Sequence, residues 1–174
     1  MLALHNGNIG AMRNQYIYII GFLLCLLLLS EAYYLQYVKN ILPCLLCIMQ
    51  RLVYYILAVI FLIATVHNPY KLGQRVYATL IFSSALIGAG FSLRQIYLQQ
   101  LPFEKAPPCT PSLNFMLHNF PLQRVIKALF YGSGNCTVVH TRILRWDLAE
   151  WSLLFFVIFT IIAIVLFLKT KPAK

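Results

Sequence analysis

Cysteines are the residues of this chain best suited to chemistry, and four of the five lie at or outside the ends of long apolar segments. Cys44 and Cys47 follow Pro43 at the start of one such segment. Two thiols three positions apart lie on adjacent turns of a helix and can close into a small, readily exchanged disulfide ring. A disulfide between residues this close in sequence constrains almost none of the unfolded chain. The pair therefore indicates redox chemistry rather than a structural brace.

A cationic residue lies on the same side of the predicted helix as this cysteine pair. Cys44, Cys47 and Arg51 are related by i, i+3 and i+7, which places them on one side of a helix. Both Arg51 and the positive amino-terminal end of the helix favour a thiolate at Cys47. An unpaired cation inside an apolar run is costly, so we expect Arg51 to face the bundle and meet an anion, a carbonyl or a bound ligand such as a quinone.

The other two exposed cysteines, Cys109 and Cys136, lie in the longest polar segment. A disulfide between them would close a loop worth about 3 to 4 kcal/mol in the chain-entropy model, enough to act as a brace. Two purely structural disulfides remain an alternative, as does a zinc site, although the second pair lacks ligand spacing and we assign no metal. Cys25 lies in the middle of an apolar segment, where a neutral thiol acts as a small apolar side chain.

The elements that must position these residues are four apolar segments. The chain is 61% hydrophobic and only 10% charged, and a helix needs about 20 apolar residues to cross a bilayer. The segments span about 16–35, 45–66, 76–98 and 151–168. We therefore predict an all-α membrane protein, a single domain over residues 1–174 folded as an antiparallel four-helix bundle. The outer loops run over about 36–44 and 99–150.

The charge pattern indicates how these helices are oriented. A net charge of +10 would suggest nucleic acid in a soluble protein, but the basic residues lie at helix ends and in loops beside membrane lipid. Those in the short segments favour cytoplasmic amino and carboxyl termini. The cysteine-bearing loops then face an oxidising compartment, the periplasm of a bacterium, where disulfides form.

A short amphipathic helix is predicted within the long loop. Its apolar residues recur at helical spacing, Pro121 marks its start and Gly132 its end. We expect it to lie on the membrane surface, although packing on the bundle would explain the spacing equally well. The apolar positions are Leu122, Val125, Ile126, Leu129 and Phe130.

Several motifs together point to a known family. They are Pro43-Cys44-Leu45-Leu46-Cys47 with Arg51, Arg94-Gln95-Ile96-Tyr97-Leu98-Gln99, Pro108-Cys109, Gly134-Asn135-Cys136 and Glu150-Trp151-Ser152-Leu153. On these motifs the chain resembles the disulfide bond formation protein B family, which acts with the oxidant DsbA and a quinone to keep the bacterial periplasm oxidising.

The resemblance implies a quinone-dependent protein-disulfide oxidoreductase of the bacterial inner membrane. Its partner would be a periplasmic, DsbA-like protein with the thioredoxin fold, reoxidised through a mixed disulfide with Cys109. Cys136 would then attack the disulfide at Cys44, and Cys47 would face ubiquinone or menaquinone.

The resemblance also implies a quinone site lined by Arg51, Arg94 and Gln95. Arg94 is equally compatible with a side chain that extends to the membrane interface. A four-helix transporter that uses Glu31 as its coupling carboxylate is the alternative from another functional class. A vitamin K epoxide reductase-like enzyme is a further rival, but in that family the Cys-x-x-Cys pair usually lies on the last helix.

Overall fold

The computed structural model describes residues 2–40, 43–69, 71–101, 113–131, 142–143 and 146–169. Within them, four long helices and four short elements follow one another along the chain. The long helices are α1 (Leu2–Tyr37), α2 (Leu45–His67), α3 (Lys71–Gln99) and α6 (Leu148–Lys169). The short elements are helices α4 (Leu113–Asn119) and α5 (Leu122–Tyr131) and strands β1 (Arg142–Ile143) and β2 (Trp146–Asp147).

Each long helix contains a segment long and apolar enough to cross a membrane. These segments are Gln15–Tyr37, Leu45–His67, Leu72–Gln99 and Leu148–Lys169. They confirm the four predicted spans, with boundaries that differ by only a few residues. Many large apolar side chains are exposed on the outside of the bundle, including Leu23, Ile56 and Leu86, as expected of a surface that faces lipid.

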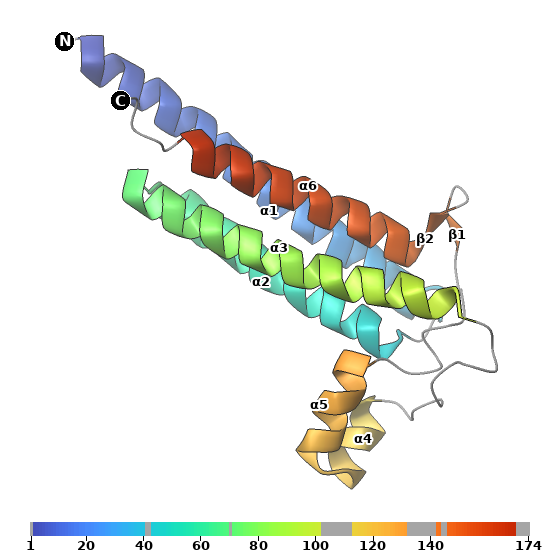
Figure 1. The fold of residues 1–174 in the computed structure, drawn as a ribbon. Helices are drawn as coiled ribbons and strands as arrows, with labels where there is room; N and C mark the ends of the chain where they lie inside the picture. Colours follow the sequence, from blue (N-terminus) through green and yellow to red (C-terminus); the bar gives the residue numbers. More distant parts are fainter. Residues whose placement is uncertain are drawn as a thin grey trace.

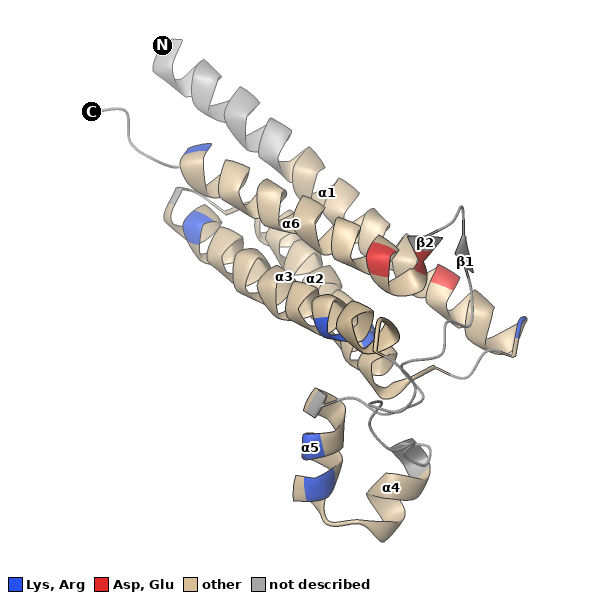
Figure 2. Cartoon of the chain, turned by 45° about the vertical axis from the view of Figure 1, so that its right-hand side comes forward, with Lys and Arg blue, Asp and Glu red and all other residues tan. Residues whose placement is uncertain are grey.

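The four long helices form an antiparallel bundle (Figure 1), as predicted. α2 packs against α1 and α3, and α3 packs against α6. One end of the bundle, which we call the terminal end, holds the start of α1, the end of α6 and the α2–α3 turn. The other end, the loop end, holds the start of α2 together with α4, α5, β1 and β2. Among the described residues, Lys and Arg are grouped near helix ends and on α5 (Figure 2).

Small residues and aromatic rings bring the helices close together. A Cβ atom on Gly88 would lie 2.3 Å from the ring of Phe156, and one on Gly21 would lie 2.7 Å from the ring of Phe61. These glycines therefore allow rings from neighbouring helices to rest against the backbone. Phe156 also stacks on Tyr54 at 4.6 Å between ring centres.

A buried polar cluster lies within this apolar core, and the sequence did not predict it. The Tyr54 hydroxyl lies 2.9 Å from Ser152 Oγ, and Ser92 Oγ donates to the same oxygen at 3.4 Å. The cluster joins α2, α3 and α6 through hydroxyl groups that would be costly to bury without partners.

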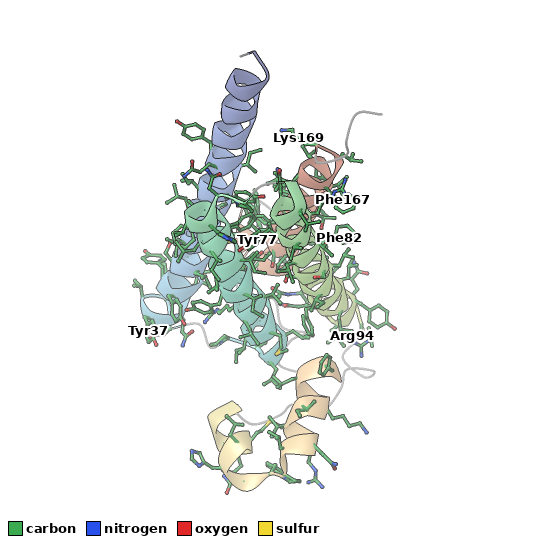
Figure 3. All side chains as sticks on the ribbon, turned by 90° about the vertical axis from the view of Figure 1, so that its left-hand side faces the viewer. Tyr37, Tyr77, Phe82, Arg94, Phe167 and Lys169 are labelled. Carbon is green, nitrogen blue, oxygen red and sulfur yellow. The ribbon has the colours of Figure 1, made fainter. Side chains whose placement is uncertain are left out.

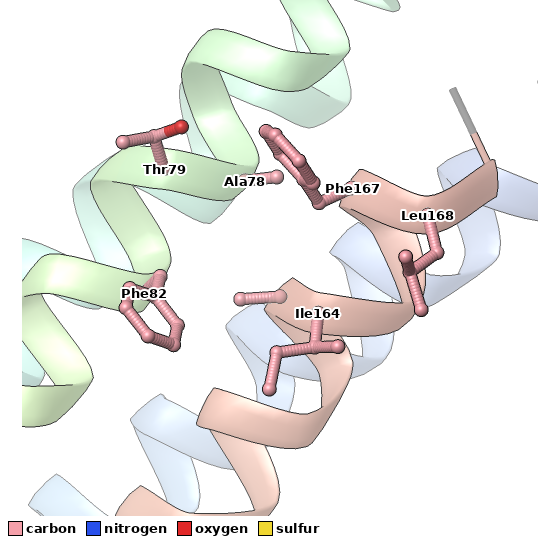
Figure 4. A pocket seen from close by; sticks show the side chains of 7 residues that line it. Ala78, Thr79, Phe82, Ile164, Phe167 and Leu168 are labelled. Carbon is pink, nitrogen blue, oxygen red and sulfur yellow. The ribbon is translucent and has the colours of Figure 1, made fainter. Parts of the chain in front are cut away.

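The terminal end has a short turn and an open groove. Asn68 adopts a left-handed conformation with φ of 40° and donates its backbone N–H to Ala64, which ends α2. Tyr77 points into the bundle (Figure 3) and its hydroxyl lies 3.1 Å from His67 Nδ1. Between α3 and α6, apolar side chains including Phe82 and Phe167 line a groove of about 270 Å³ (Figure 4).

The predicted loop helix is present as α5, which covers Leu122–Tyr131. Its Val125 is buried against Leu45 of α2 and Met116 of α4, so one face of α5 packs on the loop end of the bundle. Leu122 is 66% exposed. Contact of this side of α5 with the membrane surface stays a prediction. Helix α4 and the antiparallel pairing of β1 with β2 are additional elements that the sequence did not predict.

Candidate functional site

Cys44 and Cys47 lie together where α2 begins. Cys44 is the N-cap residue, with extended backbone geometry, and its sulfur accepts a hydrogen bond from the Cys47 backbone N–H at 3.3 Å. The two sulfur atoms are 2.6 Å apart, so the pair is placed to form a disulfide with little movement. Cys44 is buried and Cys47 is partly exposed, so Cys47 is the more exposed residue of the pair.

The local sequence explains why the cysteines take these positions. Pro43 lacks a backbone N–H and disfavours a helix at the residue before it, so it suits the position just ahead of the cap. A sulfur at the N-cap meets N–H groups that have no partner within the helix. The start of α2 therefore provides hydrogen bonds and partial positive charge that favour a thiolate.

Gln95 from α3 reaches the sulfur of Cys47. Its Nε2 donates to Cys47 Sγ at 3.3 Å, and its Oε1 accepts from Nε2 of Gln50 at 2.9 Å. Both amides are buried at the interface between α2 and α3. Gln95 was among the predicted site residues, and the structure brings it directly to Cys47.

Gln50 was not predicted as a site residue. The available signal was an amide inside an apolar segment, three positions after Cys47, because a polar group at such a place requires a partner in the bundle. The sequence alone does not identify that partner, since Gln95 is far along the chain and on another helix.

Arg51 meets carbonyl groups, which is one of the partners that the sequence led us to expect. Its guanidinium donates to Ala32 O at 2.9 Å and to Gln36 Oε1, and it lies 5.5 Å from the ring centre of Tyr33. All three partners belong to α1, so Arg51 joins the loop ends of α1 and α2. Gln36 was not predicted to take part.

Arg94 lies at the loop end of α3 (Figure 3), with its guanidinium 5.6 Å from the ring centre of Tyr97. Tyr97 is exposed on the bundle surface. This contact fits the interfacial position that we considered for Arg94, beside its predicted role in quinone binding.

Glu31 is exposed on the outside of α1. A coupling carboxylate of a transporter would face the interior of the bundle or a water-filled path, so its position does not favour the transporter alternative. Cys25 is fully buried in the apolar core, as expected for a packing residue.

The second cysteine pair, Cys109 and Cys136, lies outside the described residues. The elements nearest to each in the chain are α4, which begins at Leu113, and α5, which ends at Tyr131. Both helices lie at the loop end of the bundle (Figure 1), where Met116 of α4 and Val125 of α5 pack against Leu45, the residue after Cys44.

Several known proteins are similar to this chain over most of its length. The family model "Disulfide bond formation protein DsbB" matches residues 14–166. The chain belongs to the DsbB family. "Disulfide bond formation protein B" of Nitrosococcus oceani is 41% identical over 150 residues, which cover 86% of this chain and 89% of that protein. "Disulfide bond formation protein B 1" of Pseudomonas aeruginosa is 33% identical over 153 residues, or 88% and 94% of the two chains.

Membership in the DsbB family confirms the resemblance seen in the sequence motifs. The matched region includes the first three membrane spans, the fourth as far as residue 166, and both cysteine pairs. The family is one of disulfide bond formation, and the adjacent sulfurs of Cys44 and Cys47 provide a site suited to that chemistry.

Proposed function

We propose that this DsbB-family protein oxidises the thiols of a soluble, DsbA-like thioredoxin-fold partner and passes the electrons to a membrane quinone. The observation that supports this most directly is the position of Cys47. Its sulfur lies 2.6 Å from Cys44 Sγ and 3.3 Å from the amide nitrogen of Gln95, at the loop end of a membrane helix. A thiol pair placed there is within reach of both a soluble protein and a ligand dissolved in the bilayer.

Electrons and bonds balance over a sequence of thiol–disulfide exchanges. A partner thiolate attacks Cys109 of a Cys109–Cys136 disulfide, which forms a mixed disulfide and releases Cys136. Cys136 attacks Cys44 of the Cys44–Cys47 disulfide and releases Cys47 as a thiolate. The second partner thiol resolves the mixed disulfide and frees Cys109, which then attacks Cys136 and releases Cys44. The net result is one disulfide in the partner and two reduced thiols at Cys44 and Cys47.

The residues around Cys47 suit a quinone, ubiquinone or menaquinone. When bound, the quinone would accept the two electrons and two protons of the reduced pair. Gln95 offers an amide N–H group beside the sulfur, and amides of this kind hydrogen-bond to carbonyl oxygens. Arg51, one turn after Cys47 on α2, and Arg94, the residue before Gln95 on α3, would supply further donors. The partial positive charge at the start of α2 would favour the thiolate of Cys47.

We also propose that the protein lies in the bacterial inner membrane with its terminal end in the cytoplasm. α1 begins, α6 ends and α2 turns into α3 at that end (Figure 1). The cysteine-bearing loop end would then face the oxidising periplasm, where a thiol oxidase can work.

Purified protein in detergent with quinone, mixed with a reduced thioredoxin-fold partner, tests this function. Quinone absorbance and the thiol state of each cysteine are followed together. We expect quinone reduction to accompany partner oxidation, and Cys47→Ala and Cys109→Ala each to stop turnover. Cys109→Ala should also lose the mixed disulfide. Cys25→Ala is the matched control, because this cysteine is buried in the core, and it should retain turnover. Turnover that survives the loss of Cys47 would disprove the proposal.

A further inference from the structure

We infer that Gln50 is a positioning residue, which holds the Gln95 side-chain amide with its N–H group directed at the sulfur of Cys47. The inference rests on the proposed function, in which Cys47 acts as a thiolate. The described hydrogen bond of Gln50 goes to Gln95 and not to the sulfur of Cys47. Gln50 therefore acts on Cys47 through Gln95.

The three side chains form a chain of hydrogen bonds across the α2–α3 interface. Gln50 Nε2 donates to Gln95 Oε1 at 2.9 Å, and Gln95 Nε2 lies 3.3 Å from Cys47 Sγ. Gln50 is 6% exposed and Gln95 is 4% exposed, so little water competes for these groups. In this environment each hydrogen bond is stronger than it would be in water.

The orientation of the Gln95 amide determines what Cys47 meets. One end of an amide donates hydrogen bonds and the other only accepts them. The Cys47 thiol donates to Gln95 Oε1 at 3.6 Å, and Gln95 Nε2 donates to the sulfur at 3.3 Å, so both ends of the amide lie within reach. A thiolate gains a charge-assisted hydrogen bond from the N–H end, whereas the carbonyl end would place partial negative charge beside it. By occupying Oε1, Gln50 favours the orientation that stabilises the thiolate.

Neighbouring residues of α2 thus serve different partners. Arg51 donates its described hydrogen bonds to carbonyl groups of α1, whereas Gln50 donates to Gln95 of α3. One side-chain donor beside the Cys47 sulfur is thus an amide from α3, and we infer that Gln50 sets its direction.

The test measures the thiolate at Cys47 directly. The full-length protein is reduced and then freed of reductant and quinone under anaerobic conditions. It is treated with iodoacetamide over a range of pH, and mass spectrometry gives the alkylation rate of Cys47. A hydrogen bond from Gln95 to the charged thiolate of Cys47 stabilises that thiolate, which is the form that reacts with iodoacetamide. We therefore expect Gln50→Leu to slow alkylation at neutral pH about fivefold. Gln74→Leu is the matched control, a buried glutamine at the terminal end of α3, and it should leave the rate unchanged.

A double-variant comparison shows whether Gln50 acts through Gln95. If it does, Gln50→Leu slows alkylation in the original protein but has no further effect when Gln95→Leu is already present. An equal effect in both backgrounds, or no effect in either, would overturn the inference. If Gln50→Leu does not fold, Gln50→Glu replaces it in the test. Glutamate keeps the size of the side chain, but its carboxylate can draw the Gln95 N–H group away from the sulfur. An unchanged alkylation rate in Gln50→Glu would also overturn the inference.

The alkylation assay requires neither quinone nor partner, so its result is independent of the proposed function. A Gln50-dependent thiolate in a protein that never reduces quinone would disprove the proposed function and leave this role intact. Normal quinone reduction with a thiolate indifferent to Gln50 would disprove the positioning role alone.

Discussion

The sulfur of Cys44 caps the helix on which Cys47 lies, because it accepts the backbone N–H of Cys47 at 3.3 Å. One cysteine is therefore both half of the thiol pair and the N-cap of α2. Helix formation and thiol placement are thus linked at this point, since the backbone geometry that starts α2 also brings the two sulfurs to 2.6 Å.

This dual role predicts that Cys44→Ser and Cys44→Ala differ in stability but not in activity. Both should abolish disulfide turnover, since neither side chain forms a disulfide. Serine keeps a hydrogen-bond acceptor at the N-cap, whereas alanine loses it, at a cost of about 1 kcal/mol. Thermal unfolding of the reduced proteins in detergent should rank Cys44→Ala below Cys44→Ser, and equal stabilities would show that a hydrogen-bond acceptor at this N-cap does not stabilise α2.

Arg51 should stabilise the α1–α2 contact even when no quinone is present. Arg51→Lys replaces a planar fork that reaches Ala32 and Gln36 by a single ammonium group, and we expect a loss of about 1 to 2 kcal/mol. Arg124→Lys is a suitable control because Arg124 also lies over an aromatic ring, at 5.5 Å from that of Phe120, but on exposed α5. Quinone-free thermal unfolding should separate the two variants, and equal melting temperatures would exclude this role.

Helix packing at Gly88 should not tolerate a methyl group. In Gly88→Ala the new Cβ would lie 2.3 Å from the ring of Phe156, and overpacking of this kind typically costs about 1 to 3 kcal/mol. Nothing lies within 4 Å of the corresponding position at Gly90. Gly90→Ala should therefore stabilise the helix by about 0.5 to 1 kcal/mol. Unfolding measurements that gave both variants the same sign would contradict the described α3–α6 packing.

The polar cluster of the core should contribute measurably to stability. Tyr54→Phe removes the hydroxyl that bonds to Ser152 but keeps the ring stacked on Phe156. Since hydrogen bonds between membrane helices contribute about 0.6 kcal/mol on average and up to about 1.7, we expect a loss in this range. Tyr55→Phe removes an exposed hydroxyl that donates to Tyr33, and it should have a smaller effect in the same unfolding assay.

Glu31 should be dispensable for thiol oxidation. Its side chain is exposed on the outer surface of α1, away from the interior position that a coupling carboxylate needs. Glu31→Gln should keep the rate of quinone reduction with a reduced thioredoxin-fold partner. Loss of that rate, with normal expression and folding, would return the carboxylate to consideration as a functional group.

The sequence alone determined the four membrane spans, the α5 helix and the Cys44–Cys47 pair at the start of α2. Each of these depends on local properties: the length of an apolar run, the periodicity of side chains, or a spacing of three residues at the start of one helix. The tertiary structure decided that Arg51 turns to α1, that Gln50 meets Gln95, and that Tyr54 meets Ser152. Spans bordered by lipid are apolar on nearly every side, so their sequences do not show which face meets a neighbouring helix. Only the packed bundle brings together polar groups that lie far apart along the chain.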